Sequence, residues 1–365
     1  MGVIRLLLAI SVVMAHAGPV FGISLVGGQV AVQAFYIISG FYMTLVLNEK
    51  YIGKNNSYKL FISNRFLRLY PIYWVVLLMT VGLSLLTGIW THGEYWLKFQ
   101  PFVNHYQDLS ISSFMYLLFA NIFLVGQDWI MFMGLNTANG QFFFTTNFWE
   151  TEPQLWSFLF VSQAWTIGVE ITFYLIAPFL VRRKPLVIIG IILLSLFIRL
   201  ILVNKGLDQD PWSYRFFPNE ILFFMLGNLS YRMYKKIELA TINTRYLSGV
   251  LGFLILSTLF YNSIDFSFKM QTYLFVFFLI LPFIFKLTKK NKMDQWIGDL
   301  SYPVYLSHML FILVIAKLQP LVNILGKGLT VTILAILISI LLNKYVAKPI
   351  ENLRQNRVKL RTQAV

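Results

Sequence analysis

Two ionisable residues lie inside long apolar runs, where their side chains could do chemistry. His16 lies about halfway along the run 3–22, and Glu170 lies about ten residues from the nearer end of the run 160–181. Such groups are costly at membrane depth unless they are paired or hydrated, so they indicate a functional site. Histidine titrates near neutral pH, and a carboxylate bonded to one ring nitrogen would fix its tautomer. The two residues are therefore a candidate proton-transfer pair.

Arginine residues lie near the ends of these runs. Arg5 precedes His16 by eleven residues, so on an α-helix the two would share nearly the same face, about 16 Å apart. Arg65 and Arg68 are three residues apart, which places both guanidinium groups on one helical face. Such a pair matches phosphoryl oxygens. Ordinary anchoring at a cytoplasmic membrane surface explains the pair equally simply.

The elements that must position these residues are membrane helices. The chain has 365 residues, of which 58% are hydrophobic and 12% charged, about half the charged share of a soluble domain. Runs of about 17–25 apolar residues are long enough to cross a bilayer. We expect them at 3–22, 26–48, 69–89, 160–181, 186–203, 216–234, 246–264, 270–287, 301–317 and 328–346. The sequence therefore predicts an all-α polytopic membrane protein with about ten transmembrane helices.

Positive charge gathers in every second connection between these runs. Arg5, these connections and the C-terminal tail hold 23 of the 30 Lys and Arg residues. The connections contain Lys50, Lys54, Lys59, Arg65 and Arg68, then Arg182, Arg183 and Lys184, then Arg232, Lys235, Lys236 and Arg245, and then Lys286, Lys289, Lys290 and Lys292. Because positive connections stay cytoplasmic, both termini are predicted to be cytoplasmic. The net charge of +15 then reflects topology and contact with anionic lipids, and we expect no nucleic-acid partner.

The composition also excludes some chemistry. The chain has no cysteine, so a disulfide, a zinc–thiolate site and a cysteinyl acyl-enzyme are all excluded, and we expect no metal site.

The N-terminal run also imitates a secretory signal peptide, and cleavage after Ala17 would remove His16. A second apolar run follows almost at once, and the charge alternation requires the first run as a helix. We therefore expect His16 to be retained.

Residues 90–159 form a long connection on the predicted extracytoplasmic side. Its apolar stretch 114–125 is too short to span comfortably, and aromatic side chains are frequent in the rest. These aromatics are either interfacial anchors or platforms for stacking on a sugar ring. Near the outer ends of their helices, Arg199 and Glu220 could pair with each other. A purely structural role is open for His308, which could form a hydrogen bond between helices.

Five motifs, in order along the chain, resemble those of the membrane-bound acyltransferase 3 family. They are Arg5 with His16, and the segments 34–41 (AFYIISGF), 64–74 (NRFLRLYPIYW), 164–174 (AWTIGVEITFY) and 298–308 (GDLSYPVYLSH). The resemblance extends from Arg5 to about Pro349. It implies a membrane domain over residues 1–350 followed by a basic cytoplasmic tail, 351–365. Gln33 departs from the acidic residue of many relatives, and we expect the form that lacks a C-terminal hydrolase-like domain.

The resemblance also implies an O-acetyltransferase. The donor would be a cytoplasmic acyl-CoA, most simply acetyl-CoA, used as a co-substrate with no permanently bound cofactor. The acceptor would be a hydroxyl of an extracytoplasmic glycan such as lipopolysaccharide O-antigen, capsule or exopolysaccharide. The expected location is the bacterial inner membrane, with membrane lipids as further partners.

The same resemblance suggests roles for individual residues. His16 matches the family's proposed catalytic histidine, and Glu170 would orient it, balance its charge or help to hold the acceptor. Arg65 and Arg68 match a motif implicated in handling the donor phosphates, and Arg5 would contact the donor or stabilise negative charge in the transition state. The motifs contribute further acceptor-binding or structural candidates: Ser39, Tyr70, Trp165, Tyr305 and His308.

Two other functions are compatible with parts of the sequence. A proton-coupled transporter or flippase of a lipid-linked sugar would use a buried His–Glu pair equally well. Against it, the sequence lacks obvious paired helices broken by Gly or Pro in two halves. A non-enzymatic membrane scaffold would give no reason for His16 or Glu170 to lie in apolar runs.

Overall fold

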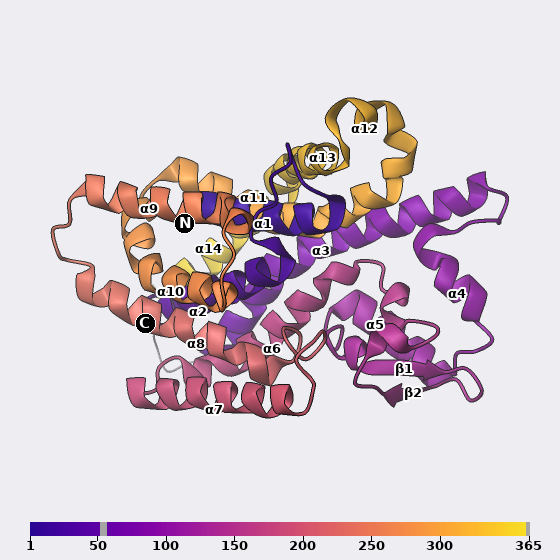
Figure 1. The fold of residues 1–365 in the computed structure, drawn as a ribbon, viewed down its shortest axis with the longest axis horizontal. Helices are drawn as coiled ribbons and strands as arrows, with labels where there is room; N and C mark the ends of the chain where they lie inside the picture. The colour runs from indigo at the N-terminus through magenta and orange to yellow at the C-terminus, as the bar shows by residue number, and fades with distance from the viewer. Residues whose placement is uncertain (52–56, 363–365) are drawn as a thin grey trace. The chain divides into compact units, whose positions relative to one another are not determined.

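Each of the ten apolar runs forms a helix in the computed structural model (Figure 1). The structure describes residues 1–51 and 57–362, so Lys54 of the first positive connection and residues 363–365 of the predicted tail lie outside it. The helices are α1 (Gly2–Ala17), α2 (Gly27–Glu49), α3 (Ser57–Trp90), α6 (Trp165–Leu180), α7 (Pro185–Asn204), α8 (Phe217–Ile237), α9 (Thr244–Leu259), α10 (Lys269–Thr288), α11 (Lys292–Val314) and α13 (Lys327–Leu342). Among the described residues, seven of these ten helices are long and apolar enough to cross a membrane. Helices α1 and α9 are apolar but shorter, and α8 is long enough but less apolar, so the structure supports seven of the ten predicted spans. The predicted all-α polytopic membrane protein is confirmed.

Shorter elements fill the connections. The helices among them are α4 (Gln100–His105), α5 (Ile111–Phe123), α12 (Gln319–Leu325) and α14 (Lys348–Thr362). The 3-10 turns are η1 (Leu97–Phe99), η2 (Trp129–Phe132), η3 (Phe148–Glu150), η4 (Leu155–Phe158), η5 (Ser162–Ala164), η6 (Tyr261–Ser263) and η7 (Ile315–Leu318), and η8 (Asn343–Ala347) is a π-helical turn. An antiparallel hairpin of β1 (Met133–Asn136) and β2 (Gln141–Phe144) is a small β element that the sequence did not predict.

The ends of several helices differ from the prediction, and three of these differences bear on candidate site residues. Helix α1 ends at Ala17, because Gly18 takes a left-handed φ of 102° and Pro19 follows it. His16 therefore lies in the last turn of α1, and the expectation that it lies halfway along its helix is wrong. Helix α6 begins at Trp165, so Glu170 lies near its N-terminal end. Helix α3 begins twelve residues before the predicted run 69–89, which places Arg65 inside the helix instead of at its mouth.

The chain divides into two compact units, which are described separately. Unit 1 comprises Met1–Ile72, Tyr174–Leu194 and Ile221–Val365, and unit 2 comprises Tyr73–Phe173 and Ser195–Glu220. In unit 1, helix α1 packs against α2, α11 and α13 (Figure 1). The buried centre of this packing consists of the small residues Ala9, Val13, Ala17, Val304, Val331 and Ala335. Small side chains let the helix backbones approach closely, as is common between membrane helices.

Helices α1 and α11 approach each other most closely near their first turns. A Cβ atom added to Gly2 would lie 1.5 Å from the carbonyl oxygen of Asp294, so no larger residue fits there. The carboxylate of Asp294 accepts hydrogen bonds from the backbone N–H groups of Gly2 (2.7 Å) and Val3 (3.0 Å). An anion at a helix N-terminus satisfies these N–H groups and opposes the helix dipole. Asp294 of α11 therefore caps the N-terminus of α1 and holds it against the first turn of α11.

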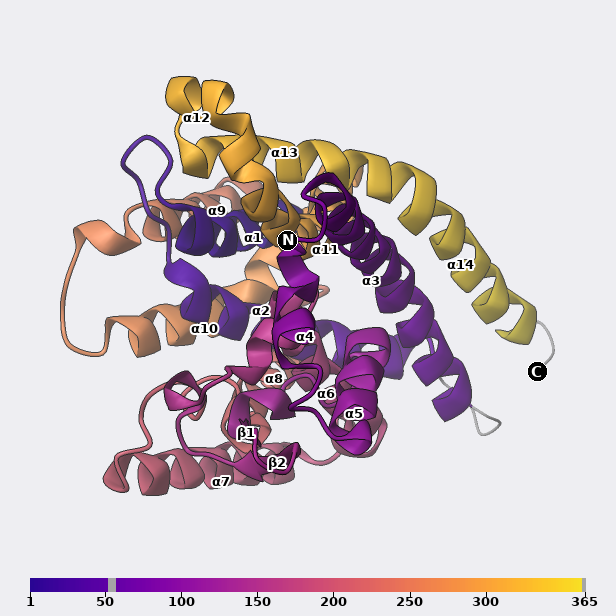
Figure 2. The same ribbon diagram turned by 90° about the vertical axis from the view of Figure 1, so that its right-hand side faces the viewer.

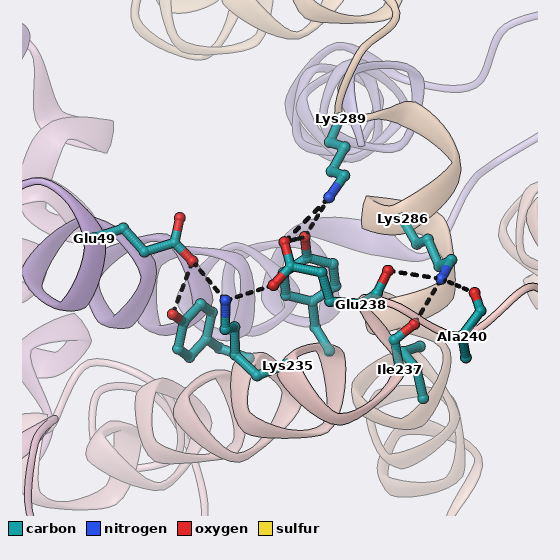
Figure 3. A network of polar contacts seen from close by, with 9 residues as sticks. Glu49, Lys235, Ile237, Glu238, Ala240, Lys286 and Lys289 are labelled. Atoms are coloured by element: carbon teal, nitrogen blue, oxygen red, sulfur yellow. Dashed lines mark hydrogen bonds and ion pairs between the residues drawn. The ribbon is translucent and has the colours of Figure 1, made fainter.

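Connections that were predicted to share the cytoplasmic side meet at one end of unit 1 (Figure 3). Lys235 of α8 contacts Glu49 of α2 at 3.5 Å and Glu238 at 2.5 Å. Lys289, which follows α10, contacts Glu238 at 3.3 Å. Hydrogen bonds from Lys235 and the Tyr234 hydroxyl lower the pKa of Glu238 to about 2. The grouping supports the charge alternation, and the side of the membrane that this end faces stays a prediction.

Several of these basic side chains also bind the carbonyl groups at helix C-termini. Lys286 donates to the carbonyl oxygens of Ile237 (2.6 Å), Glu238 (3.0 Å) and Ala240 (2.5 Å), where α8 ends (Figure 3). Arg182 in the same way donates to the carbonyl of Tyr51 at 2.9 Å, just after α2. Cations at helix C-termini satisfy carbonyls that have no partner within the helix. These charges therefore join neighbouring helix ends in addition to marking topology.

Unit 2 is held together by polar side chains that bind backbone groups. Asn121, near the end of α5, donates to the carbonyl of Phe158 at 3.0 Å and accepts from the N–H of Phe160 at 2.8 Å. The hydroxyl of Tyr73 donates to the carbonyl of Asn121. Arg199 of α7 pairs with the fully buried Glu220 of α8 at 3.0 Å, which confirms the predicted pairing of these two residues.

Candidate active site

Two histidines from the first and the last family motif meet in unit 1. His16 lies in the last turn of α1 and His308 lies in the second half of α11, 292 residues later in the chain. The Nε2 atom of His308 lies 3.2 Å from the Nδ1 atom of His16, and the ring centroids are 5.1 Å apart. His308 is fully buried, whereas His16 is exposed. The contact joins a buried imidazole to an accessible one.

The hydrogen-bond partners of the two rings define a tautomer for each. The Nδ1 atom of His308 lies 2.6 Å from the carbonyl oxygen of Tyr305, so this nitrogen carries the proton in the neutral ring and Nε2 accepts. The Nδ1 atom of His16 lies 3.0 Å from the carbonyl oxygen of Val12 and 3.2 Å from Nε2 of His308, so it is the donor to both. Nε2 of His16 then carries the lone pair. A nitrogen in this state is suited to take a proton.

Arg5 lies toward the other end of α1. Its Nη1 atom would lie 3.2 Å from a Cβ atom built on Gly298, so the guanidinium group passes over the backbone of α11. Eleven residues of helix separate it from His16, a rise of about 16 Å. The spacing predicted from the sequence is thus kept along α1, with Arg5 and His16 near opposite ends of the helix.

A cluster of arginines joins α3 to α14. Glu351 of α14 lies 4.0 Å from Arg68 and forms an ion pair with Arg354 one turn further along its own helix. Arg357 donates from Nη2 to the hydroxyl of Ser63 at 3.0 Å and from Nη1 to Asn64 at 3.3 Å. We call Arg65, Arg68, Arg354 and Arg357 the arginine cluster.

The arginine cluster holds more positive charge than its carboxylates balance. Arg65 and Arg354 are only 8% and 7% exposed, and their Nε atoms are buried without a hydrogen-bond partner among the described residues. Arg354 is repelled by both Arg65 and Arg68, and the carboxylates that act on the cluster are Glu351 and Asp299. A buried charge requires a counter-charge. The cluster is therefore a candidate site for a ligand with several negative charges.

Helix α14 was missed as part of the site. Residues 351–365 were predicted to be a basic tail, whereas α13, η8 and α14 form one continuous helical run (Figure 2). A signal was present in the sequence, because Glu351, Arg354 and Arg357 are each three residues apart and so share a helical face. That spacing predicts a charged stripe but does not say which helix it meets.

The remaining candidates in unit 1 contact neighbouring side chains and backbone groups, and their predicted role in acceptor binding stays a prediction. Ser39 shares a hydrogen bond of 3.2 Å with the hydroxyl of Tyr174. Tyr70 is 5% exposed and stacks on Phe66 with ring centroids 4.1 Å apart. Tyr305 supplies the carbonyl that orients His308, and its ring lies 6.0 Å from the imidazole. These contacts pack and orient the helices that carry the histidines and arginines.

Glu170 and Trp165 belong to unit 2. Trp165 is 6% exposed, and the guanidinium carbon of Arg215 lies 4.3 Å from the centre of its ring. Glu170 lies one turn further along α6 and is partly exposed. His16 belongs to unit 1, so the predicted partnership of His16 with Glu170 stays a prediction. The structure does show a contact of His16 with His308.

Replacement of His308 separates a positioning role from a packing role. In His308→Gln the side-chain amide oxygen can still accept from Nδ1 of His16, whereas in His308→Leu nothing accepts. We expect the Leu variant to lose roughly 10–100-fold in kcat, the usual effect of removing such an orienting partner, and the Gln variant to lose several-fold less. Steady-state rates of acyl transfer at saturating donor would measure this. Equal losses in the two variants at equal thermal stability would contradict the positioning role.

Comparison with known proteins places the chain in context. A family model described as "Acyltransferase domain" matches residues 1–344. A comparison with curated proteins and one with solved structures each returned no match. Helix α14, with Arg354 and Arg357, follows the matched segment.

Proposed function

The chain belongs to the acyltransferase 3 family, and from this premise we propose that it moves an acyl group from a cytoplasmic acyl-CoA to a hydroxyl of an extracytoplasmic glycan. It is an integral membrane protein and an acyltransferase. Acetyl-CoA is the simplest donor, used as a co-substrate with no permanently bound cofactor. Lipopolysaccharide O-antigen, capsule or exopolysaccharide is the proposed acceptor, and the bacterial inner membrane is the proposed location.

The observation that carries the proposal is the contact of the accessible His16 ring with the buried His308 ring. The Nδ1 atom of His16 donates to Val12 and His308, so the lone pair of His16 lies on Nε2, on an accessible ring at the end of α1. Nε2 would take the proton of the acceptor hydroxyl as that oxygen attacks the thioester carbonyl. The C–S bond then breaks, and the departing coenzyme A thiolate recovers the proton from His16. Direct transfer of this kind needs no covalent acyl-enzyme.

The arginine cluster supports the donor half of the proposal. The donor carries several phosphate charges, and Arg65, Arg68 and Arg354 supply the excess positive charge that would balance them. Arg5 lies at the same end of α1 as the start of α11, some 16 Å along the helix from His16. The pantetheine arm would span this distance and bring the thioester toward the imidazole.

The test is release of free coenzyme A. The purified protein in lipid nanodiscs receives acetyl-CoA and a surface glycan whose ester groups have been removed by mild base, and the free thiol is measured. We expect thiol release that depends on the glycan, together with a gain of 42 Da on the glycan by mass spectrometry (the mass of one acetyl group). Movement of glycan across the bilayer without thiol release would favour a transporter and would contradict the proposal.

A further inference from the structure

Unit 2 contains a pocket of about 360 Å³ that is lined by none of the proposed catalytic or donor-binding residues. Its wall comes from two separate connections, residues 128–144 and residues 212–218. Both lie on the predicted extracytoplasmic side, the side of the proposed acceptor. The volume lies within the range of about 300–1,000 Å³ that is usual for small-molecule sites.

Aromatic rings line most of the pocket. Trp212 packs against Phe132 and Phe144, with ring centroids 5.1 Å and 6.1 Å away and ring planes near perpendicular, and its indole N–H donates to the carbonyl of Thr146 at 2.9 Å. Trp129 also lines the pocket and is 57% exposed. Large aromatic faces of this kind offer flat apolar surfaces to a ligand.

Two buried ionisable groups also line the pocket. Asp128 is 3% exposed, and burial raises its pKa to about 7, an effect that hydrogen bonds from its own and the next N–H only partly oppose. Its carboxylate lies over α6, since a Cβ atom on Gly168 would lie 2.7 Å from Oδ1. Arg215 is held beside the pocket by an ion pair with Asp210 and by the ring of Trp165. The pocket thus combines apolar faces with a carboxylate and a guanidinium group.

We infer that this pocket binds a pyranose unit of the acceptor glycan, with the aromatic rings stacking on the apolar face of the sugar and Asp128 and Arg215 binding its hydroxyl groups. A sugar ring presents both kinds of surface at once. An alkyl chain would fill the aromatic part but could not form hydrogen bonds with Asp128 or Arg215, whereas the hydroxyl groups of a sugar can bind both. The inference rests on the proposed function for the identity of the glycan.

Three substitutions test the pocket. Trp129→Ala removes an exposed stacking surface, and Asp128→Asn keeps the shape of the side chain while it removes the charge. Trp149→Ala is the matched control, because Trp149 is 48% exposed in the same long connection and does not line the pocket. Each variant is assayed in nanodiscs with acetyl-CoA and the de-esterified surface glycan, and glycan binding without acetyl-CoA is followed by quenching of tryptophan fluorescence.

We expect Trp129→Ala and Asp128→Asn each to raise the glycan concentration for half-maximal rate about tenfold or more, with an unchanged KM for acetyl-CoA. Trp149→Ala should stay within about twofold of the wild type in both quantities. Normal glycan dependence in both pocket variants would overturn the pocket assignment and leave the proposed function intact. Quenching by 1-octanol but not by the glycan would assign the pocket to an alkyl chain and also overturn it.

The binding measurement separates the two proposals in the opposite case. If the wild type binds the glycan in a manner that depends on Trp129 but releases no thiol, the pocket stands as a glycan site and the transferase proposal fails. If the wild type neither binds the glycan nor releases thiol, both proposals fall.

Discussion

Replacement of His16 by alanine is expected to lower the rate of acyl transfer by about 10²–10⁴-fold, the range typical of removing a general base. The KM for acetyl-CoA should not change, because the arginine cluster that would bind the donor lies on α3 and α14. The measurement is steady-state release of coenzyme A thiol with the glycan held at saturation. Full activity in His16→Ala would remove the imidazole from the mechanism.

Three controls keep this result interpretable. His92→Asn changes another exposed histidine that lies after α3, and the Asn side chain tolerates the positive φ of 52° at that position, so its activity should match the wild type. The thermal midpoint of His16→Ala in detergent should fall by only a few degrees, since His16 is exposed and the main loss is its hydrogen bond to the buried His308. Added imidazole should restore part of the activity of His16→Ala, because the end of α1 is accessible. A purely structural role for His16 would show no such rescue.

Replacement of Arg354 by alanine is expected to raise the KM for acetyl-CoA about tenfold or more, with little change in kcat. A charge-assisted hydrogen bond contributes about 1.5–3 kcal/mol, which corresponds to roughly 10–100-fold in binding. Arg68→Ala should act in the same direction. Arg354→Lys should recover only part of the loss, because the ammonium group cannot form the two parallel bonds of a guanidinium fork. The measurement is the donor dependence of thiol release at saturating glycan.

The arginine prediction has a matched control and a ligand control. Arg245→Ala removes an exposed arginine from another predicted cytoplasmic connection and should leave the donor dependence unchanged. Acetyl-dephospho-CoA lacks one phosphate, so the penalty of Arg354→Ala should shrink with this donor if Arg354 contacts that group. If the KM for acetyl-CoA is unchanged in both Arg354→Ala and Arg68→Ala, the cluster serves topology and lipid contact only.

Much of the fold follows from local pattern. Each apolar run became a helix, because a membrane-length stretch of apolar residues satisfies its backbone hydrogen bonds only as a helix. The connections rich in Lys and Arg meet in unit 1, as their alternation along the chain predicts. Arg199 and Glu220, placed by the same pattern near the outer ends of α7 and α8, do pair.

The helix ends were predicted less well, for an identifiable reason. The apolar run continues past Gly18 and Pro19, but the helix cannot continue through these two residues. Helix α1 therefore ends at Ala17, and His16 lies at the end of its helix instead of in the middle. Helix α3 is longer than predicted, because the polar residues before Leu69 were excluded from the apolar run although the helix starts at Ser57. Helix α14 was hidden in the same way, because a highly charged segment that continues a membrane helix looks like a tail.

The sequence by itself therefore determined the class of the protein, its ten helical runs and the residue types that could do chemistry. These depend on composition and on spacings within one helix, which are local properties of the chain. Only the tertiary structure decided the partners. It set His308 against His16 across 292 residues, brought Arg354 of α14 to Arg65 and Arg68 of α3, and assembled an aromatic pocket with Asp128 from two separate connections. Such contacts depend on how helix faces pack against one another, and no periodicity within a single segment records that packing.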